Sequence, residues 1–215
     1  MTIFLQHLKD RLRSRPLLLF TLKVFALLPA CFVLWHYLSA FVAGPGVAVA
    51  KAILTAWLPE LVDEVSLRST EMFVMSRYGE SGGQIVSADQ AGNQLAYPIS
   101  TRALSYSTAF YAALHFATGP GARWSQFGWS LLVLWMLLAI GLVSTAAKDL
   151  MLAMPEVFTA LPQTPPADVI ALLYQFSALI VPPLAPILLW AYNARDSEAL
   201  RSLLPRPRKP AQASE

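Results

Sequence analysis

The stretch FGWSLLVLWMLLAIGLVSTAA, residues 127–147, contains no charged side chain. A run of about 20 predominantly apolar residues is long enough to cross the hydrocarbon core of a bilayer as an α-helix. The stretch therefore predicts a membrane-spanning helix, which ends where the charged pair Lys148 and Asp149 follows it.

The composition of the whole chain is that of a protein with the bilayer as its solvent. Of the 215 residues, 56% are hydrophobic and 13% are charged, whereas about 25% of the residues of a soluble domain are charged. We therefore expect an integral membrane protein, mainly α-helical and surrounded by membrane lipid. The net charge of +3 comes from basic residues gathered at the two chain ends. They lack the interleaved aromatic residues of an RNA-binding surface, so no nucleic-acid partner is expected.

Three more membrane helices are expected, which makes about four in all. A basic N-terminus, residues 1–16, precedes an apolar stretch at 17–43. That stretch is too long for the hydrophobic part of a signal peptide, which measures about 7–15 residues, so it predicts an uncleaved helix. Gly44, Pro45 and Gly46 are helix breakers and predict the end of this helix.

The second expected helix, 101–118, is polar for a membrane span. Its small residues recur at four-residue spacing, which lets a neighbouring helix approach closely: Ala109, Ala113 and Ala117. A helix enclosed by its neighbours is the favoured interpretation, and a re-entrant segment is the alternative. The fourth expected helix, 169–193, contains three prolines that predict a kink or a break: Pro182, Pro183 and Pro186.

The segment between the first two helices, residues 44–100, predicts a small α+β insert. Apolar residues at four-residue spacing predict an amphipathic helix within 47–65. Three pieces that resemble strands follow, LRSTEMFVMSRY, QIVSA and QLAYP, separated by the turn sequences GESGG and DQAGN. We expect a three-stranded meander that leans on the preceding helix, on the bilayer surface or on a partner protein.

The charge distribution predicts the orientation of the chain in the membrane. A four-helix arrangement places ten basic and four acidic residues on the side of the two termini, and five basic and nine acidic residues on the other side. Basic residues concentrate on the cytoplasmic side. We therefore expect a multi-pass protein of the bacterial inner membrane with both termini inside, including a basic tail at 194–215. The insert and the loop at 148–168 are then extracytoplasmic.

No motif indicates catalysis, a cofactor or a metal. The sequence HExxH and a pair of intramembrane aspartates are absent. The segment GESGG at 79–83 has the spacing GxSxG, but it is interpreted as a turn. Cys31 and His36 are five residues apart, which turns their side chains about 140° from each other on a helix. The chain is therefore expected not to be an enzyme. The remaining candidates are interface or polar-core residues: Arg102, His115, Lys148, Asp149, Gln175, Pro182 and Pro186.

His115 has two interpretations, because ionisable residues within membrane helices are costly and often functional. One interpretation is a proton carrier. The favoured one is a structural histidine that bonds a backbone carbonyl near the loop at Gly119. Similarly, Arg102, Lys148 and Asp149 are expected to be charges at helix ends.

Three segments resemble the exosortase H-associated membrane proteins of Gram-negative bacteria. They are YPISTRALSYSTAFYAALHFATGPGARW at 97–124, SLLVLWMLLAIGLVSTAAKDL at 130–150 and ALLYQFSALIVPPLAPILLWAYNARD at 171–196. The last contains Pro182, Pro186 and Trp190 at four-residue spacing. The first helix and the insert match that family in arrangement. The resemblance implies a protein that accompanies a polytopic, transpeptidase-like sorting enzyme acting on C-terminal sorting signals, and that lacks the active site of that enzyme.

Three functional hypotheses follow, in order of preference. The first is a non-catalytic accessory or scaffold protein of an envelope protein-sorting system, whose insert contacts the sorting enzyme or its substrates. The second is a small transporter or channel component that uses the proline-containing fourth helix and His115. The third is an intramembrane enzyme that uses Cys31.

Overall fold

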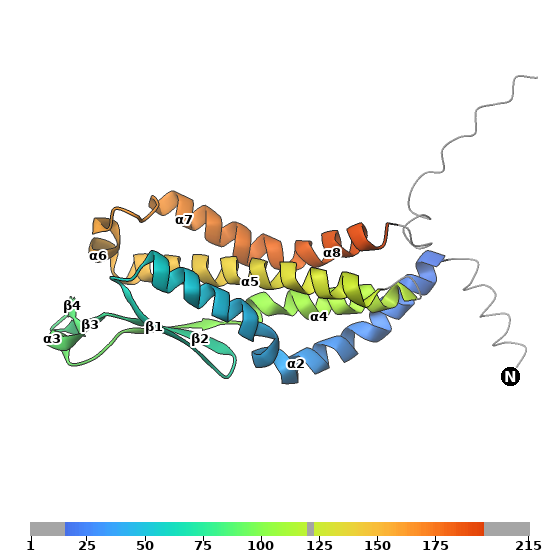
Figure 1. Cartoon of the computed structure of the whole chain (residues 1–215), viewed down its shortest axis with the longest axis horizontal. Coiled ribbons are helices and arrows are strands. Elements are labelled where there is room, and N and C mark those ends of the chain that lie inside the picture. The colour runs from blue at the N-terminus through green and yellow to red at the C-terminus, as the bar shows by residue number, and fades with distance from the viewer. Residues whose placement is uncertain (1–15, 120–122, 196–215) are drawn as a thin grey trace, which may run out of the picture.

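The computed structural model describes residues 16–119 and 123–195 and consists of long helices side by side, with a small sheet at one end (Figure 1). The chain ends of the described part lie at the opposite end of the bundle. The helices are α2 (Pro16–Trp57), α3 (Ala88–Ala91), α4 (Arg102–Ala117), α5 (Trp124–Ala153), α6 (Pro155–Ala160), α7 (Ala167–Tyr174), the π-helix η2 (Gln175–Ile180) and α8 (Val181–Asn193).

Three helical stretches are long and apolar enough to cross a membrane: Leu17–Trp57, Trp124–Ala153 and Ala167–Asn193. They contain the first, third and fourth helices expected from the sequence. Helix α4, the expected second span, has 16 residues. That corresponds to about 24 Å, less than the roughly 30 Å of a bilayer core. Four spans therefore remain a prediction, whereas a membrane protein with three apolar helices and a sheet insert is confirmed.

Helix α4 is enclosed by its neighbours, as the small-residue spacing predicts. It packs against α2, α5 and α8, and its three small residues are all buried: Ala109, Ala113 and Ala117. A polar helix in this position avoids lipid, which explains how it tolerates its serine, tyrosine and histidine side chains.

The predicted end of the first helix at residue 43 is wrong, because α2 continues through Gly44, Pro45 and Gly46 to Trp57. Helix α2 bends midway along its length (Figure 1). A proline inside a helix removes one backbone donor and bends the helix, but it does not end the helix where packing stabilises the continuation. The separate amphipathic helix predicted within 47–65 is therefore also wrong: residues 47–57 are the second half of α2, and residues 62–65 belong to the first strand of the insert.

Contacts with α5 stabilise this bend. Gly46 lies so close to α5 that a Cβ atom there would be 2.7 Å from Cδ2 of Leu138. Near the same point, Nε1 of Trp135 donates a 2.8 Å hydrogen bond to the carbonyl of Val42. Gly46 therefore permits α2 and α5 to cross closely. The indole of Trp135 supplies a hydrogen-bond donor to the carbonyl of Val42, in the turn of α2 that contains Pro45.

The insert forms two sheets, and the expected three-stranded meander is wrong in its pairing. Strands β1 (Val62–Arg68), β2 (Glu71–Ser76) and β5 (Ala96–Ser100) form an antiparallel sheet in the order β1-β2-β5. Strands β3 (Tyr78–Ser81) and β4 (Gln84–Ser87) form a separate hairpin. The piece LRSTEMFVMSRY contains the end of β1 and all of β2, because the chain reverses at Ser69, which has a φ of 56°.

The main sheet packs on the preceding helix, as the sequence predicts, and also on the distal part of α5 and on α6. One hydrophobic cluster joins these elements through buried side chains, among them Leu54, Leu58, Val65, Met72, Val74, Leu150, Met154 and Phe158. We call this unit, residues 47–100 and 146–166, the sheet module. Its position is set by two helices, since α2 and α5 continue from the bundle directly into it (Figure 1).

Of the kink or break that the prolines predict in the last long helix, the break is absent. The chain is helical from Ala167 to Asn193, and the turns before Pro182 are a π-helix. The amide of Val181 donates to the carbonyl of Phe176, five residues earlier. This shifted register accommodates prolines that cannot donate, so the helix passes the proline run without breaking.

Candidate functional site

Polar side chains between α4, α5 and α8 form a closed hydrogen-bonded network at the end of the bundle far from the sheet module. Nδ2 of Asn193 donates to Oη of Tyr111 at 2.9 Å and to Oγ of Ser130 at 2.8 Å. The Tyr111 hydroxyl is 3.2 Å from Nδ1 of His115, and His115 also has a hydrogen bond with the backbone of Arg123. We call these residues the polar network.

The polar network bears on the interpretation of His115. The hydroxyl of Tyr111 accepts a hydrogen bond from Asn193, so its own hydrogen can be donated to a neighbour such as Nδ1 of His115. His115 is only 3% exposed. A buried imidazole beside a hydrogen-bonding hydroxyl fits the structural interpretation of His115.

Small and polar residues form the crossing of α5 with η2 in the middle of the bundle. The hydroxyls of Ser144 and Ser177 are 2.6 Å apart, and both residues are buried. A Cβ atom at Gly141 would lie 3.4 Å from the carbonyl oxygen of Ser177. The crossing therefore combines close backbone approach with a hydroxyl pair, which is the usual means of joining helices in a membrane.

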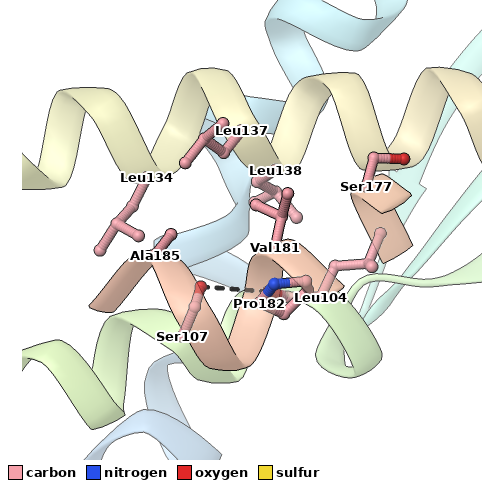
Figure 2. A pocket seen from close by; sticks show the side chains of 9 residues that line it. All are labelled: Leu104, Ser107, Leu134, Leu137, Leu138, Ser177, Val181, Pro182 and Ala185. Carbon is pink, nitrogen blue, oxygen red and sulfur yellow. Dashed lines mark hydrogen bonds between the residues drawn. The ribbon is translucent and has the colours of Figure 1, made fainter. Parts of the chain in front are cut away.

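A cavity of about 10 Å³ lies beside this crossing, between α4, α5 and α8 (Figure 2). Pro182 lines it together with leucines and with two serines, Ser107 and Ser177. The Ser107 hydroxyl donates to the carbonyl of Leu104 at 3.2 Å. A space of this size holds about one water molecule, so the cavity has no room for a solute.

Arg102 begins α4 and connects it to α2. Its Nε is 3.4 Å from Oγ of Ser39 and its guanidinium is 3.5 Å from the carbonyl of His36. One turn further along α4, Ser105 accepts a 3.2 Å hydrogen bond from Nε1 of Trp35. The side chain of Arg102 therefore links α4 to α2 through hydrogen bonds.

Lys148 and Asp149 form a half-buried ion pair of 2.9 Å at the base of the sheet module. The ammonium of Lys148 also lies 4.4 Å from the ring centroid of Tyr174. Tyr97 of β5 is near this pair: burial raises the pKa of its hydroxyl, and the negative charge of Asp149 adds to the increase. The hydroxyl of Tyr97 is buried and has no partner among residues 16–119 and 123–195.

The other predicted candidates do not join these clusters. Gln175 lies on the exposed side of η2. Pro186 is buried within α8. The predicted residues thus fall into separate groups, with Arg102 of α4 against α2, Lys148 and Asp149 under the sheet, and His115 at the far end of the bundle. The part of the chain that the structure describes contains no group of three or more His, Cys, Asp or Glu side chains that could hold a metal ion.

A groove in the sheet module was missed by the sequence reasoning. It has a volume of about 550 Å³ and lies between the β3–β4 hairpin and α6. Its lining residues are Gly83, Gln84, Ile85, Met154, Pro155, Glu156 and Val157. Ligand pockets in proteins measure about 300–1,000 Å³, so this groove is large enough for a binding partner. The turn sequence around Gly83 predicts the hairpin, but no signal in the sequence places it beside α6.

Comparison with known proteins adds a family. No curated protein and no solved structure matches the chain. One family matches it over residues 14–197, and its description is "Exosortase H-associated membrane protein". The match includes all the described helices and both sheets, and agrees with three apolar helices suited to a membrane. The chain therefore belongs to the exosortase H-associated membrane protein family.

Proposed function

We propose that this chain is a non-catalytic accessory subunit of an exosortase-type protein-sorting system, and that it binds the sorting enzyme or the substrates of that enzyme through the sheet module. The name of its family describes an association with exosortase H. The observation that supports the module as the contact is its construction. Two bundle helices continue into it and fix its position, while its groove between β3–β4 and α6 is open.

The proposal includes an orientation. Four spans, with α4 as the second, place both termini in the cytoplasm of a bacterial cell and the sheet module outside the inner membrane. The excess of basic residues on the side of the termini supports this orientation. Binding sites placed on rigid elements hold their geometry better than sites on loops alone.

The internal polar contacts favour an accessory role over transport or catalysis. His115, the candidate proton carrier, is buried and its Nδ1 is 3.2 Å from the hydroxyl of Tyr111. The cavity beside Pro182 measures about 10 Å³, and the helix that contains this proline is continuous. Cys31 lies on α2, half-buried, with His36 exposed one turn and a half away.

Affinity purification tests the association. The tagged chain is co-expressed with exosortase H and purified in mild detergent, and an unrelated tagged three-helix membrane protein is the control. We expect exosortase H to co-purify with this chain alone. Failure to recover it in several mild detergents and after cross-linking in the membrane would contradict the proposed function.

Cysteine accessibility tests the orientation. Cys31→Ser removes the single cysteine, and a new cysteine is then placed at Ser81 or at Ser125, which are both exposed. A membrane-impermeant maleimide should label Ser81→Cys in intact cells and Ser125→Cys after lysis only. Labelling of both variants in intact cells would contradict the crossing of α4.

A further inference from the structure

The β3–β4 hairpin has two outer edges, and their backbone groups can be assigned from its turn. Gly82 and Gly83 have φ values of 60° and 82°, which is the conformation of a two-residue type I′ turn. Ser81 pairs with Gln84 next to this turn. Since hydrogen-bonded and non-hydrogen-bonded pairs alternate in antiparallel strands, the N–H and C=O groups of Ile85 point away from β3, toward the outer edge of β4.

The outer edge of β3 is covered by the chain itself. The side chain of Asn93 accepts from the amide of Glu80 and donates to its carbonyl, each at 3.1 Å. The carbonyl of Tyr78 accepts from the amide of Leu95 at 2.9 Å, and the amide of Tyr78 donates to Oγ of Ser76. Every outward backbone group between residues 78 and 80 therefore has a partner.

The outer edge of β4 differs. Within the described part of the chain, the N–H and C=O of Ile85 form no hydrogen bond. Ile85 and Gln84 line the groove of about 550 Å³, and the start of α6 forms its other wall. That wall is anchored, because Met154 and Phe158 are buried and Sδ of Met154 is 3.6 Å from Oγ of Ser76. An open strand edge in a fixed groove has the geometry that binds an extended peptide by strand addition.

The charge of the groove indicates what the peptide carries. Glu156 is the charged residue in the lining; it is exposed and forms no ion pair within residues 16–119 and 123–195. A lysine or arginine on the bound segment would complement it. We assign the occupant to another molecule, since the two ends of the described chain lie at the end of the bundle opposite the sheet module (Figure 1).

We propose that β4 binds an extended segment of a partner protein as an additional strand, with a basic side chain of that segment beside Glu156. This inference rests on the proposed function, since it assigns the mode of contact between the sheet module and the sorting enzyme or its substrates. The backbone of the bound segment supplies hydrogen-bond partners to the N–H and C=O of Ile85, and the side chains of that segment lie in the groove between β4 and α6.

Site-specific photo-cross-linking in cells that co-express exosortase H tests the inference. A benzophenone amino acid replaces Gln84, which lines the groove, or Gln90, an exposed residue of α3 outside the groove lining. Substitutions at Ile85 and Glu156 are then added to the variant that carries the benzophenone amino acid at position 84. Ile85→Pro removes the outward donor at a strand edge, where proline is tolerated, and Ile85→Val retains it. Glu156→Lys reverses the charge, and Glu156→Asp retains it.

We expect an adduct at Gln84 and none at Gln90. Mass spectrometry should map it to a segment of exosortase H or of its substrate that contains a lysine or arginine. Ile85→Pro and Glu156→Lys should each reduce its yield about fivefold or more, and the two conservative variants less than about twofold. The thermal melting of each purified variant is measured, and Glu156→Lys, at an exposed position, keeps the test valid if Ile85→Pro fails to fold.

Two kinds of failure are distinguishable. If exosortase H co-purifies but no adduct forms at Gln84, or the adduct maps to a membrane helix or to a second copy of this chain, strand addition is wrong and the proposed function stands. Yields that do not change in Ile85→Pro and Glu156→Lys also overturn strand addition. If exosortase H does not co-purify with the wild-type chain, the proposed function and this inference both fail.

Discussion

The polar network and the groove lie at opposite ends of the described structure. Polar groups are hydrogen-bonded to one another in the network, whereas at the groove they are left without a partner within that structure. Around Tyr111, side chains of α4, α5 and α8 hydrogen-bond to one another, and Tyr111, His115 and Ser130 are buried. At β4, the backbone of Ile85 faces a groove and is without a partner in the described chain. A closed network stabilises a fold, whereas an open strand edge is available to another chain. The difference predicts that variants of the first lose stability and variants of the second lose binding.

The largest effect is expected at the helix crossing that both regions depend on. Gly46→Leu places a side chain where a Cβ atom would already be 2.7 Å from Leu138, so α2 and α5 must separate. We expect a loss of about 1–3 kcal/mol or more in stability. Gly44→Leu is the matched control, since nothing lies within 4 Å of its Cβ position. Melting in detergent measures both, and equal melting temperatures would contradict the close crossing.

Asn193→Ala tests the closed region directly. It removes both donors of the amide and leaves the hydroxyls of Tyr111 and Ser130 with fewer partners. Because unpaired buried polar groups cost about 1–3 kcal/mol, the melting temperature should fall while exosortase H still co-purifies at permissive temperature. Gln84→Ala, in the groove, should have the opposite effect: the melting temperature should stay unchanged, and less exosortase H should co-purify. If Asn193→Ala and Gln84→Ala change melting temperature and co-purification in the same way, the proposed difference between the two regions is wrong.

A smaller effect is expected at the serine pair in the middle of the bundle. Ser177→Ala removes a 2.6 Å hydrogen bond with Ser144. Hydrogen bonds between membrane helices contribute about 0.6 kcal/mol on average, so a slight decrease in melting temperature is expected. A double variant with Ser144→Ala should cost no more than the single one. Additive losses in this cycle would show that the two hydroxyls do not act as a pair.

The smallest effect, and the one of opposite sign, is expected at Tyr97. Its hydroxyl is buried without a partner in the described chain, so Tyr97→Phe should raise stability by about 0.5 kcal/mol or less. The pKa of Tyr97 is raised by burial and by Asp149. The folded state therefore retains the proton longer than the unfolded state, and stability falls as pH rises from the unfolded pKa, about 10, through the folded one. Melting measured between neutral and alkaline pH should show this decrease in the wild type and less of it in Tyr97→Phe.

The apolar helices could be predicted from sequence, and their ends could not. Residues 127–147 predict a helix, and α5 contains all of them, but α5 extends from Trp124 to Ala153. The extension at the distal end is stabilised by the sheet module, in which Leu150 is fully buried. Similarly, the prediction that Gly44–Gly46 ends a helix follows local propensity, and packing on α5 overrides it.

The candidate site was predicted in part. The sequence singles out His115 and Lys148 because ionisable groups in or near a membrane are conspicuous. It does not show that Asn193 and Ser130 join Tyr111 and His115, because Asn193 and Ser130 are distant in the chain from these two neighbours on α4. The groove was not predicted at all, since residues 83–85 and 154–157 are far apart in sequence and meet only in the folded protein.

By itself, the sequence determined that the chain is a membrane protein with long apolar helices and a small sheet insert, because hydrophobic length and turn residues are local properties of the chain. The tertiary structure alone decided which strands pair, that α2 bends and continues, and that the edge of β4 faces an open groove. Those features depend on contacts between segments distant in sequence, such as Gly46 against Leu138 and β4 beside α6. Local propensity does not encode such contacts, because the free energy of packing depends on both partners.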